Sequence, residues 1–194
     1  MIGEIIINFF RFLLLLFIQV LVLNQIEIGG AVNGYLNPYL YILFILMLPV
    51  TINKTLLLFI CFITGLSVDL FSDTAGMHAS ACLFIGFIRP AFLNLIAPRE
   101  GYETTLRLNI QGMGSSTFLV YASVLVLVHH FILFLIESFS FLNFFDLLLH
   151  VITCSITTLI LIVLSQILTQ KNREAISWIY SQIESTLLVR FLSH

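Results

Sequence analysis

Long apolar runs separated by short polar stretches fill most of this 194-residue chain. A membrane-spanning helix needs roughly 17–25 mostly apolar residues. Six runs approach that requirement: Ile5–Leu23, Tyr39–Val50, Thr55–Leu70, Met77–Ile96, Gly114–Ile136 and Phe144–Thr169. The pattern therefore predicts an all-α, polytopic membrane protein with about six transmembrane helices.

The second and third runs are shorter than a full span, and the second has Pro49 near its end. Such runs could tilt, could thin the bilayer locally, or could form a broken hairpin. Four full spans plus a re-entrant pair is therefore the alternative to six helices. We favour six because of the charge distribution along the chain.

Positive charge falls on alternate connections. With the N-terminus inside, the cytoplasmic flanks hold six basic residues: Lys54, Arg99, Arg107, Lys171, Arg173 and Arg190. The three outer loops of this arrangement contain no Lys or Arg. Because basic loops stay on the cytoplasmic side, this asymmetry predicts a multi-pass protein with both termini in the cytoplasm.

Composition supports a membrane environment. Hydrophobic residues make up 60% of the chain and charged residues only 9%, with a mean hydropathy of +1.10. Soluble domains have about 25% charged residues. A net charge of −2 gives no basic patch for nucleic acid. The three cysteines lie inside apolar runs and are interpreted as small hydrophobic residues.

The sequence divides into a transmembrane domain over residues 1–170 and a tail over residues 171–194. The tail is too polar to span a membrane, but it has apolar residues at helical spacing: Ile176, Ile179, Ile183 and Leu187. One interpretation is an amphipathic helix lying along the inner interface. The alternative is a C-terminal extension without fixed structure.

Arg89 is the deepest ionisable residue, and Pro90 follows it directly. A proline inside a helix leaves a carbonyl one turn earlier, near Gly86, without its usual donor. Arg89 could donate to that carbonyl and stabilise a kink. Alternatively, it could bind an anionic lipid headgroup or the carboxylate of a partner.

A second polar group gathers near the predicted outer face: Asp69, Asp73, His78, His129, His130, Asp146 and His150. Metal binding or proton relay is conceivable for these side chains. However, no His-x3-His or Cys-x2-Cys spacing is present, so interhelical hydrogen bonding is favoured. The sequence also contains no Gly-x-Ser-x-Gly or His-Glu-x-x-His motif and no phosphate-binding glycine loop. We therefore expect a non-enzymatic protein without a metal or cofactor.

Small residues mark one further feature. Gly65 and Asp69 are four residues apart on one predicted helix, as are Gly76 and Ser80 near the start of the next. Such residues allow the backbones of two helices to approach closely. They predict tight packing, either within this bundle or with another membrane protein.

The segment Gly65-Leu-Ser-Val-Asp-Leu-Phe-Ser-Asp-Thr-Ala-Gly-Met-His-Ala-Ser-Ala-Cys, followed by Phe87-Ile-Arg-Pro and Ala97-Pro-Arg-Glu-Gly-Tyr-Glu, resembles the MreD family. These are the small membrane subunits of the bacterial rod-shape machinery. The resemblance extends to about Glu174. It implies a fold similar to the substrate-binding subunits of energy-coupling-factor transporters, and a location in the bacterial inner membrane.

The resemblance also implies a non-enzymatic scaffold. Its direct partner would be an MreC-like membrane protein, with MreB, RodA and the elongation transpeptidase as indirect partners. The implied partner-binding or pocket positions are Asp69, Asp73, Gly76, His78, Arg89, Pro90, Arg99, Glu100 and Gly101.

Two other functions remain open from the sequence. A transporter or substrate-capture subunit could use Asp69, His78, His129 and His150 to line a small-molecule pocket. An intramembrane enzyme acting on lipid-linked precursors is supported only by Arg89, and is the least favoured of the three.

Overall fold

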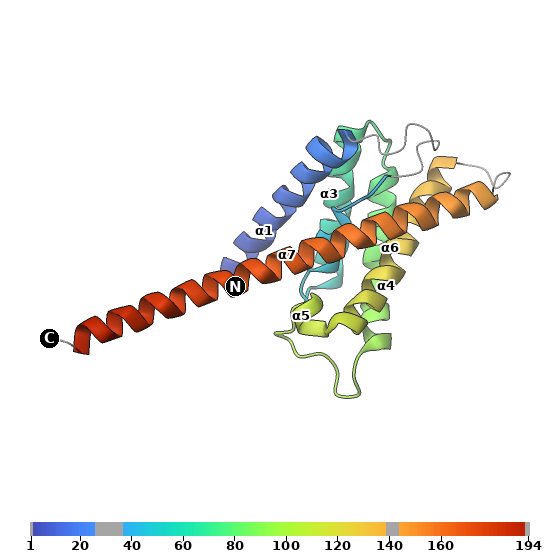
Figure 1. Ribbon diagram of the computed structural model, residues 1–194. Helices are drawn as coiled ribbons and strands as arrows, with labels where there is room; N and C mark the ends of the chain where they lie inside the picture. Colours follow the sequence, from blue (N-terminus) through green and yellow to red (C-terminus); the bar gives the residue numbers. More distant parts are fainter. Residues whose placement is uncertain (1, 26–36, 139–143, 193–194) are drawn as a thin grey trace. The chain divides into compact units, whose positions relative to one another are not determined.

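The computed structural model describes residues 2–25, 37–138 and 144–192 (Figure 1). All regular elements in these ranges are helical. They are α1 (Ile2–Phe17), the π-helical turn η1 (Ile18–Val22), the 3-10 turn η2 (Leu23–Gln25), α2 (Ile42–Leu46), α3 (Lys54–Ser72), α4 (Met77–Ile96), α5 (Ile110–Met113), α6 (Ser115–Ser138) and α7 (Phe144–Leu192). The chain forms two compact units, Met1–Leu161 and Ile162–His194.

Four helical stretches in the described ranges are long and apolar enough to cross a membrane: Lys54–Ser72, Met77–Ile96, Ser115–Ser138 and Phe144–Asn172. The shorter stretch Ile6–Val22 is also apolar. These helices confirm the prediction of an all-helical, multi-pass membrane protein. The third predicted run, one of the two that seemed too short, is a helix of 19 residues.

The second predicted run, Tyr39–Val50, is not a continuous helix. Only Ile42–Leu46 is α-helical, and all five of these residues are buried. The segment as a whole, residues 37–53, starts beside Ser72 and Thr74 at the end of α3. It finishes at Asn53, whose side chain caps the start of α3 by accepting from the Thr55 N–H at 2.8 Å. We call residues 37–53 the broken segment, because it passes along α3 from one end to the other with only one helical turn.

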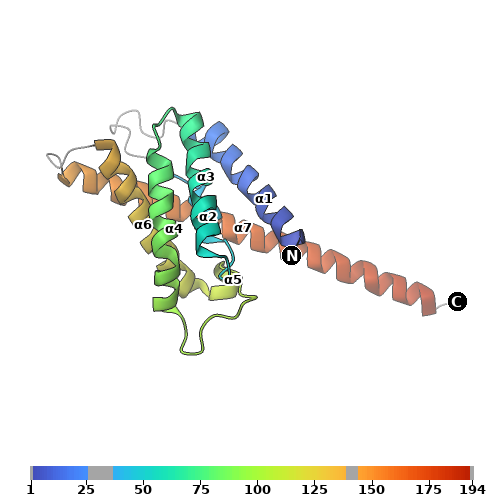
Figure 2. The same cartoon turned by 180° about the vertical axis from the view of Figure 1, so that it is seen from behind.

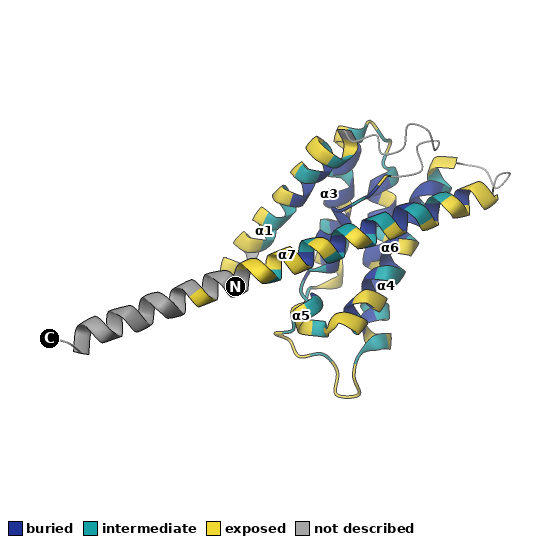
Figure 3. Cartoon of the chain, in the orientation of Figure 1, coloured by how far each residue is buried: buried dark blue, intermediate teal, exposed yellow. Residues whose placement is uncertain are grey.

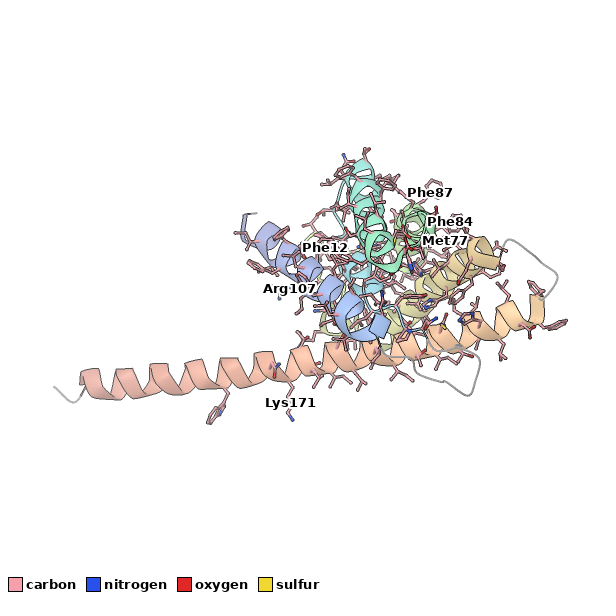
Figure 4. All side chains as sticks on the ribbon, turned by 90° about the horizontal axis from the view of Figure 1, so that it is seen from above. Phe12, Met77, Phe84, Phe87, Arg107 and Lys171 are labelled. Atoms are coloured by element: carbon pink, nitrogen blue, oxygen red, sulfur yellow. The ribbon has the colours of Figure 1, made fainter. Side chains whose placement is uncertain are left out.

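The first unit has α4 at its centre. Both α3 and α6 pack against α4, as Figures 1 and 2 show. Figure 3 shows buried residues on the facing sides of these helices and exposed residues on the outer sides. The exposed side is apolar: Phe87 of α4 is 72% exposed, and Figure 4 shows it with Phe84 on the periphery of the helix. This arrangement suits a lipid environment, because apolar side chains face outward.

One buried apolar cluster joins α4, α6 and the first turns of α7: Ala81, Leu133, Phe134, Leu147, Val151 and Cys154. In the second unit, α7 continues without interruption past the predicted boundary at residue 170 to Leu192. The tail is therefore helical as far as Leu192. Its placement at a membrane interface stays a prediction. The predicted outer loops around Gly29 and Phe141 lie outside the described residues.

Candidate functional site

Asp69 connects the end of α3 to the start of α4. The residue is only 4% exposed, and its carboxylate accepts hydrogen bonds from the backbone N–H groups of His78 at 3.0 Å and Ala79 at 2.9 Å. It also accepts from the hydroxyl of Thr74 at 2.6 Å. The first N–H groups of a helix have no partner within the helix. Asp69 supplies those partners, and its negative charge suits the helix N-terminus.

The turn between α3 and α4 explains two more predicted positions. Asp73 ends α3 with φ 53°, and Gly76 precedes α4 with φ 81°. Both angles are left-handed, a conformation that Gly adopts freely and that Asp tolerates better than most residues. The Asp73 side chain is exposed. Asp73 and Gly76 therefore serve the geometry of the turn that brings His78 back toward Asp69.

Gly65 lies one helical turn before Asp69 and faces the same part of α4. A Cβ atom at Gly65 would lie 2.6 Å from the backbone nitrogen of Ala79, where ordinary contact begins at 3.4 Å. The two helix backbones approach this closely only because Gly65 has no side chain. The predicted small-residue contact is thus present between α3 and α4.

The broken segment obtains hydrogen bonds from side chains on its neighbours. Gln19 of η1 accepts from the Leu40 N–H at 2.8 Å and donates to the Pro38 carbonyl at 3.1 Å. Thr158 of α7 accepts from the Tyr39 N–H at 3.0 Å. A membrane offers no water to non-helical backbone, so these polar groups need partners from the protein. Gln19 and Thr158 provide them.

Arg89 stabilises the other end of the broken segment. Its guanidinium donates to the carbonyl of Leu48, and its Nε donates to the Tyr121 hydroxyl at 2.8 Å. Tyr121 in turn donates to the Leu46 carbonyl at 3.0 Å. The interpretation that Arg89 donates to a carbonyl near Gly86 is wrong, because its acceptors are the Leu48 carbonyl of the broken segment and the Tyr121 hydroxyl. Arg89 is 1% exposed, which also excludes a direct contact with a lipid headgroup in this structure.

Three buried aromatic side chains form a polar chain in the middle of the first unit. The Tyr41 hydroxyl lies 2.8 Å from His78 Nδ1 and 2.8 Å from His129 Nε2. The Sγ of Cys82 lies 3.9 Å from the same nitrogen of His129. The opposite nitrogen, His129 Nδ1, is buried without a hydrogen-bond partner. We refer to His78, Tyr41 and His129 as the His–Tyr–His chain.

Other polar residues near this chain do not form a metal centre. His130 lies beside His129 but binds Thr158 at 3.2 Å and the Val126 carbonyl at 2.8 Å. No group of three or more His, Cys, Asp or Glu side chains with the geometry for a metal ion occurs in the part of the chain that the structure describes. The polar side chains around His129 instead link helices through hydrogen bonds.

A pocket opens beside His78. It has a volume of about 390 Å³, and its lining residues are Leu23, Asn24, Asn37, Pro38, Tyr39, Phe71, Ser72, Thr74 and His78. They come from the end of η1–η2, the start of the broken segment, and the turn between α3 and α4. We call this the outer pocket, because it lies at the ends of α1 and α3 that the charge distribution predicts to be outside.

The loop between α4 and α5, predicted to lie inside, is at the opposite end of α4 from the turn that follows α3, as Figure 1 shows. Arg99, Glu100 and Gly101 are exposed there. Gly101 has φ 77° and closes a turn by donating its N–H to the Pro98 carbonyl at 2.9 Å. Tyr102 donates to the Ile96 carbonyl at 3.3 Å, and its partial burial raises the pKa of the phenol.

The nine predicted site residues thus fall into three places. Asp69, Asp73, Gly76 and His78 come together at the start of α4. Arg89 and Pro90 lie within α4, where Arg89 contacts the end of the broken segment, and Arg99, Glu100 and Gly101 lie in the predicted inner loop. Sequence reasoning considered ionisable residues and missed four polar ones: Gln19, Tyr41, Tyr121 and Thr158. Each is an uncharged polar residue inside an apolar run, which is the signal that could have identified it.

Comparisons of this chain with protein-family models, curated proteins and solved structures find no match.

Proposed function

We propose that this protein is a non-enzymatic membrane scaffold of bacterial cell elongation, related in role to MreD, that binds an MreC-like protein through an apolar helical face. The residues from Gly65 to Glu103 support this proposal through their resemblance to that family. The proposal includes six membrane crossings, with the broken segment as the second, and both termini in the cytoplasm.

One structural observation supports a scaffold most directly. In the part of the chain whose burial the structure describes, Asp69 and Arg89 are the buried acidic and basic residues, and both are engaged in hydrogen bonds that hold the fold together. Meanwhile the outer sides of the helices are apolar, with Phe10 of α1 65% exposed and Phe87 of α4 72% exposed. An apolar surface in the bilayer can pack against the single transmembrane helix of a partner through van der Waals contact.

The test is a photo-cross-linking scan in the native membrane, followed by mass spectrometry. A photoreactive residue replaces Phe10, Phe87 or Phe145, which are exposed on three different helices, or the buried Tyr121 as a matched control. We expect one exposed position to cross-link an MreC-like protein and Tyr121 to cross-link no other protein. If none of the three captures a cell-elongation protein, and a pull-down of the tagged chain also recovers none, the scaffold proposal fails.

The outer pocket favours a second candidate, a small-molecule-capture subunit similar to those of energy-coupling-factor transporters. A volume of about 390 Å³ lies within the range of ligand pockets, about 300–1,000 Å³. This candidate predicts that the same pull-down recovers a pair of ABC-type ATPases. Recovery of cell-elongation proteins without such a pair would count against it.

A further inference from the structure

The outer pocket lies beside a stretch of non-helical backbone at the start of the broken segment. Residues 37–41 come before α2 and are not α-helical, although Leu40 and Tyr41 are buried. In membrane proteins, irregular backbone at such depth occurs where it is buried in protein or lines a cavity. Interrupted helices in transporters also mark ligand sites. The start of the broken segment has both features, because Asn37, Pro38 and Tyr39 line the pocket.

Among the residues that the structure describes, the lining of the outer pocket carries hydrogen-bonding groups but no formal charge. Its polar members are two amides, two aliphatic hydroxyls, a phenol and an imidazole: Asn24, Asn37, Ser72, Thr74, Tyr39 and His78. Asp69 contacts Thr74, but its carboxylate already accepts three hydrogen bonds. A charged ligand would therefore lose its hydration without gaining a counter-charge from this lining.

The His–Tyr–His chain determines which hydrogen-bonding group His78 offers. The Tyr41 hydroxyl has one hydrogen, so it can donate to at most one of the two imidazoles. His129 Nδ1 has no partner. A buried N–H without a partner is rarer than an unpaired acceptor, so Nδ1 is best assigned as the bare nitrogen. His129 Nε2–H then donates to Tyr41, and Tyr41 donates to His78 Nδ1.

This direction leaves the hydrogen of His78 on Nε2. Because Nδ1 is directed at Tyr41, Nε2 is the polar atom that the His78 ring has left for the outer pocket. An imidazole held in one tautomer by a second hydrogen bond is a fixed donor. It requires an oxygen or nitrogen acceptor on the ligand.

We propose that the outer pocket binds a small, uncharged molecule rich in hydroxyl or carbonyl oxygens, with His78 Nε2–H as a directed donor. The rings of Tyr39 and Phe71 supply apolar contact area, while Asn37 and Ser72 supply adaptable hydrogen bonds. This inference names the ligand class for the capture candidate. It does not depend on the scaffold proposal, because a scaffold can also carry an occupied pocket.

The test uses the full chain in phosphatidylcholine nanodiscs, which avoids detergents with sugar headgroups, and ring-¹⁵N-labelled histidine. The probes are D-glucose and D-glucuronate, in which a carboxylate replaces the C6 hydroxymethyl group of glucose. We expect both His78 and His129 to show the Nε2–H tautomer in their ¹⁵N shifts. Glucose should shift the His78 signal saturably, and glucuronate should bind roughly tenfold more weakly or worse because its charge is desolvated.

Matched variants on α3 locate the effect. Ser72→Ala removes a hydroxyl from the pocket lining and should weaken the glucose response. Ser67→Ala removes a hydroxyl on the same helix that donates to the Ile63 carbonyl and is not among the described lining residues, so it should leave the response unchanged. An Nδ1–H tautomer at His129 would overturn the assigned direction. A His78 signal that does not respond to glucose up to its solubility limit, or that responds equally to glucuronate, would overturn the ligand class. Neither result would alter the outcome of cross-linking to a partner, so the two proposals fail separately.

Discussion

Gly65→Ala tests whether the close approach of α3 and α4 determines the stability of the first unit. The new Cβ would lie 2.6 Å from the Ala79 nitrogen, about 0.8 Å short of ordinary contact. The obstacle is the backbone of α4, which cannot rotate away as a side chain can. The two helices must therefore separate by a distance of this order, because the interior is close-packed.

The cost has two parts. Overpacking of a well-filled interface costs about 1–3 kcal/mol. Separation also lengthens the Asp69 hydrogen bonds to the His78 and Ala79 N–H groups, now 3.0 and 2.9 Å, and loss of a helix cap costs about 0.5–2 kcal/mol. The higher helix propensity of Ala returns about 1 kcal/mol. We expect the free energy of unfolding to fall by about 2–3 kcal/mol.

The chain is suited to a thiol-exposure assay. Its three cysteines, Cys61, Cys82 and Cys154, are all fully buried. A dye that fluoresces on reaction with thiols should therefore report unfolding during a temperature ramp. A loss of 2–3 kcal/mol corresponds to a Tm lower by about 4–12 °C, using about 2–4 °C per kcal/mol for a chain of this size.

Gly3→Ala is the matched control, because a Cβ at Gly3 in α1 meets no atom within 4 Å. Its Tm should change little or rise slightly. An unchanged or higher Tm for Gly65→Ala would refute the reasoning, since helix propensity alone predicts that direction. It would mean that α3 and α4 do not approach at this residue.

Three further predictions use related measurements. Asp69→Asn should lower the free energy of unfolding by about 1–2 kcal/mol in the thiol assay, because it weakens the cap of α4. The control Asp73→Asn changes an exposed residue to one that also suits φ 53°, so it should have almost no effect; equal losses of stability in the two variants would contradict the cap. Arg89→Leu should cost about 2–4 kcal/mol because the buried Leu48 carbonyl loses its donor, with Arg89→Lys intermediate; a fully stable Arg89→Leu protein would refute this role. In intact cells, a membrane-impermeant maleimide should label Ala75→Cys but not Glu100→Cys, both at exposed positions in loops at opposite ends of α4; labelling of both or only Glu100→Cys would contradict the predicted orientation.

The sequence predicted the elements that depend on apolar length. Lys54–Ser72, Met77–Ile96 and Ser115–Ser138 match three predicted runs closely, because a stretch of that length and polarity has no stable alternative to a helix in lipid. Gly65 was also singled out correctly as a point of close helix packing, whereas Asp69, paired with it by spacing, acts through its carboxylate as the cap of α4. The family resemblance, the partner and the orientation stay predictions.

The broken segment could not be predicted in the same way. Its run from Tyr39 to Val50 is as apolar as a helix, and local propensity does not disclose that Gln19, Thr158 and Arg89 will bind its backbone. These partners are distant in sequence and come from three different helices. For Arg89, the local rule about Pro90 pointed to the wrong acceptor, because the non-helical backbone of the broken segment leaves the Leu48 carbonyl available to its guanidinium.

The broken segment also has a consequence for membrane insertion. A newly made segment with non-helical backbone cannot remain in lipid alone, because its N–H and carbonyl groups lack partners. The Tyr39 N–H finds its acceptor on Thr158, 119 residues later in the chain. We therefore expect residues 37–53 to stay outside the bilayer, or shielded by the insertion machinery, until α7 has been synthesised. The fold would then be completed only when α7 is inserted and Thr158 binds the broken segment. A chain truncated before α7 would be degraded rather than assembled.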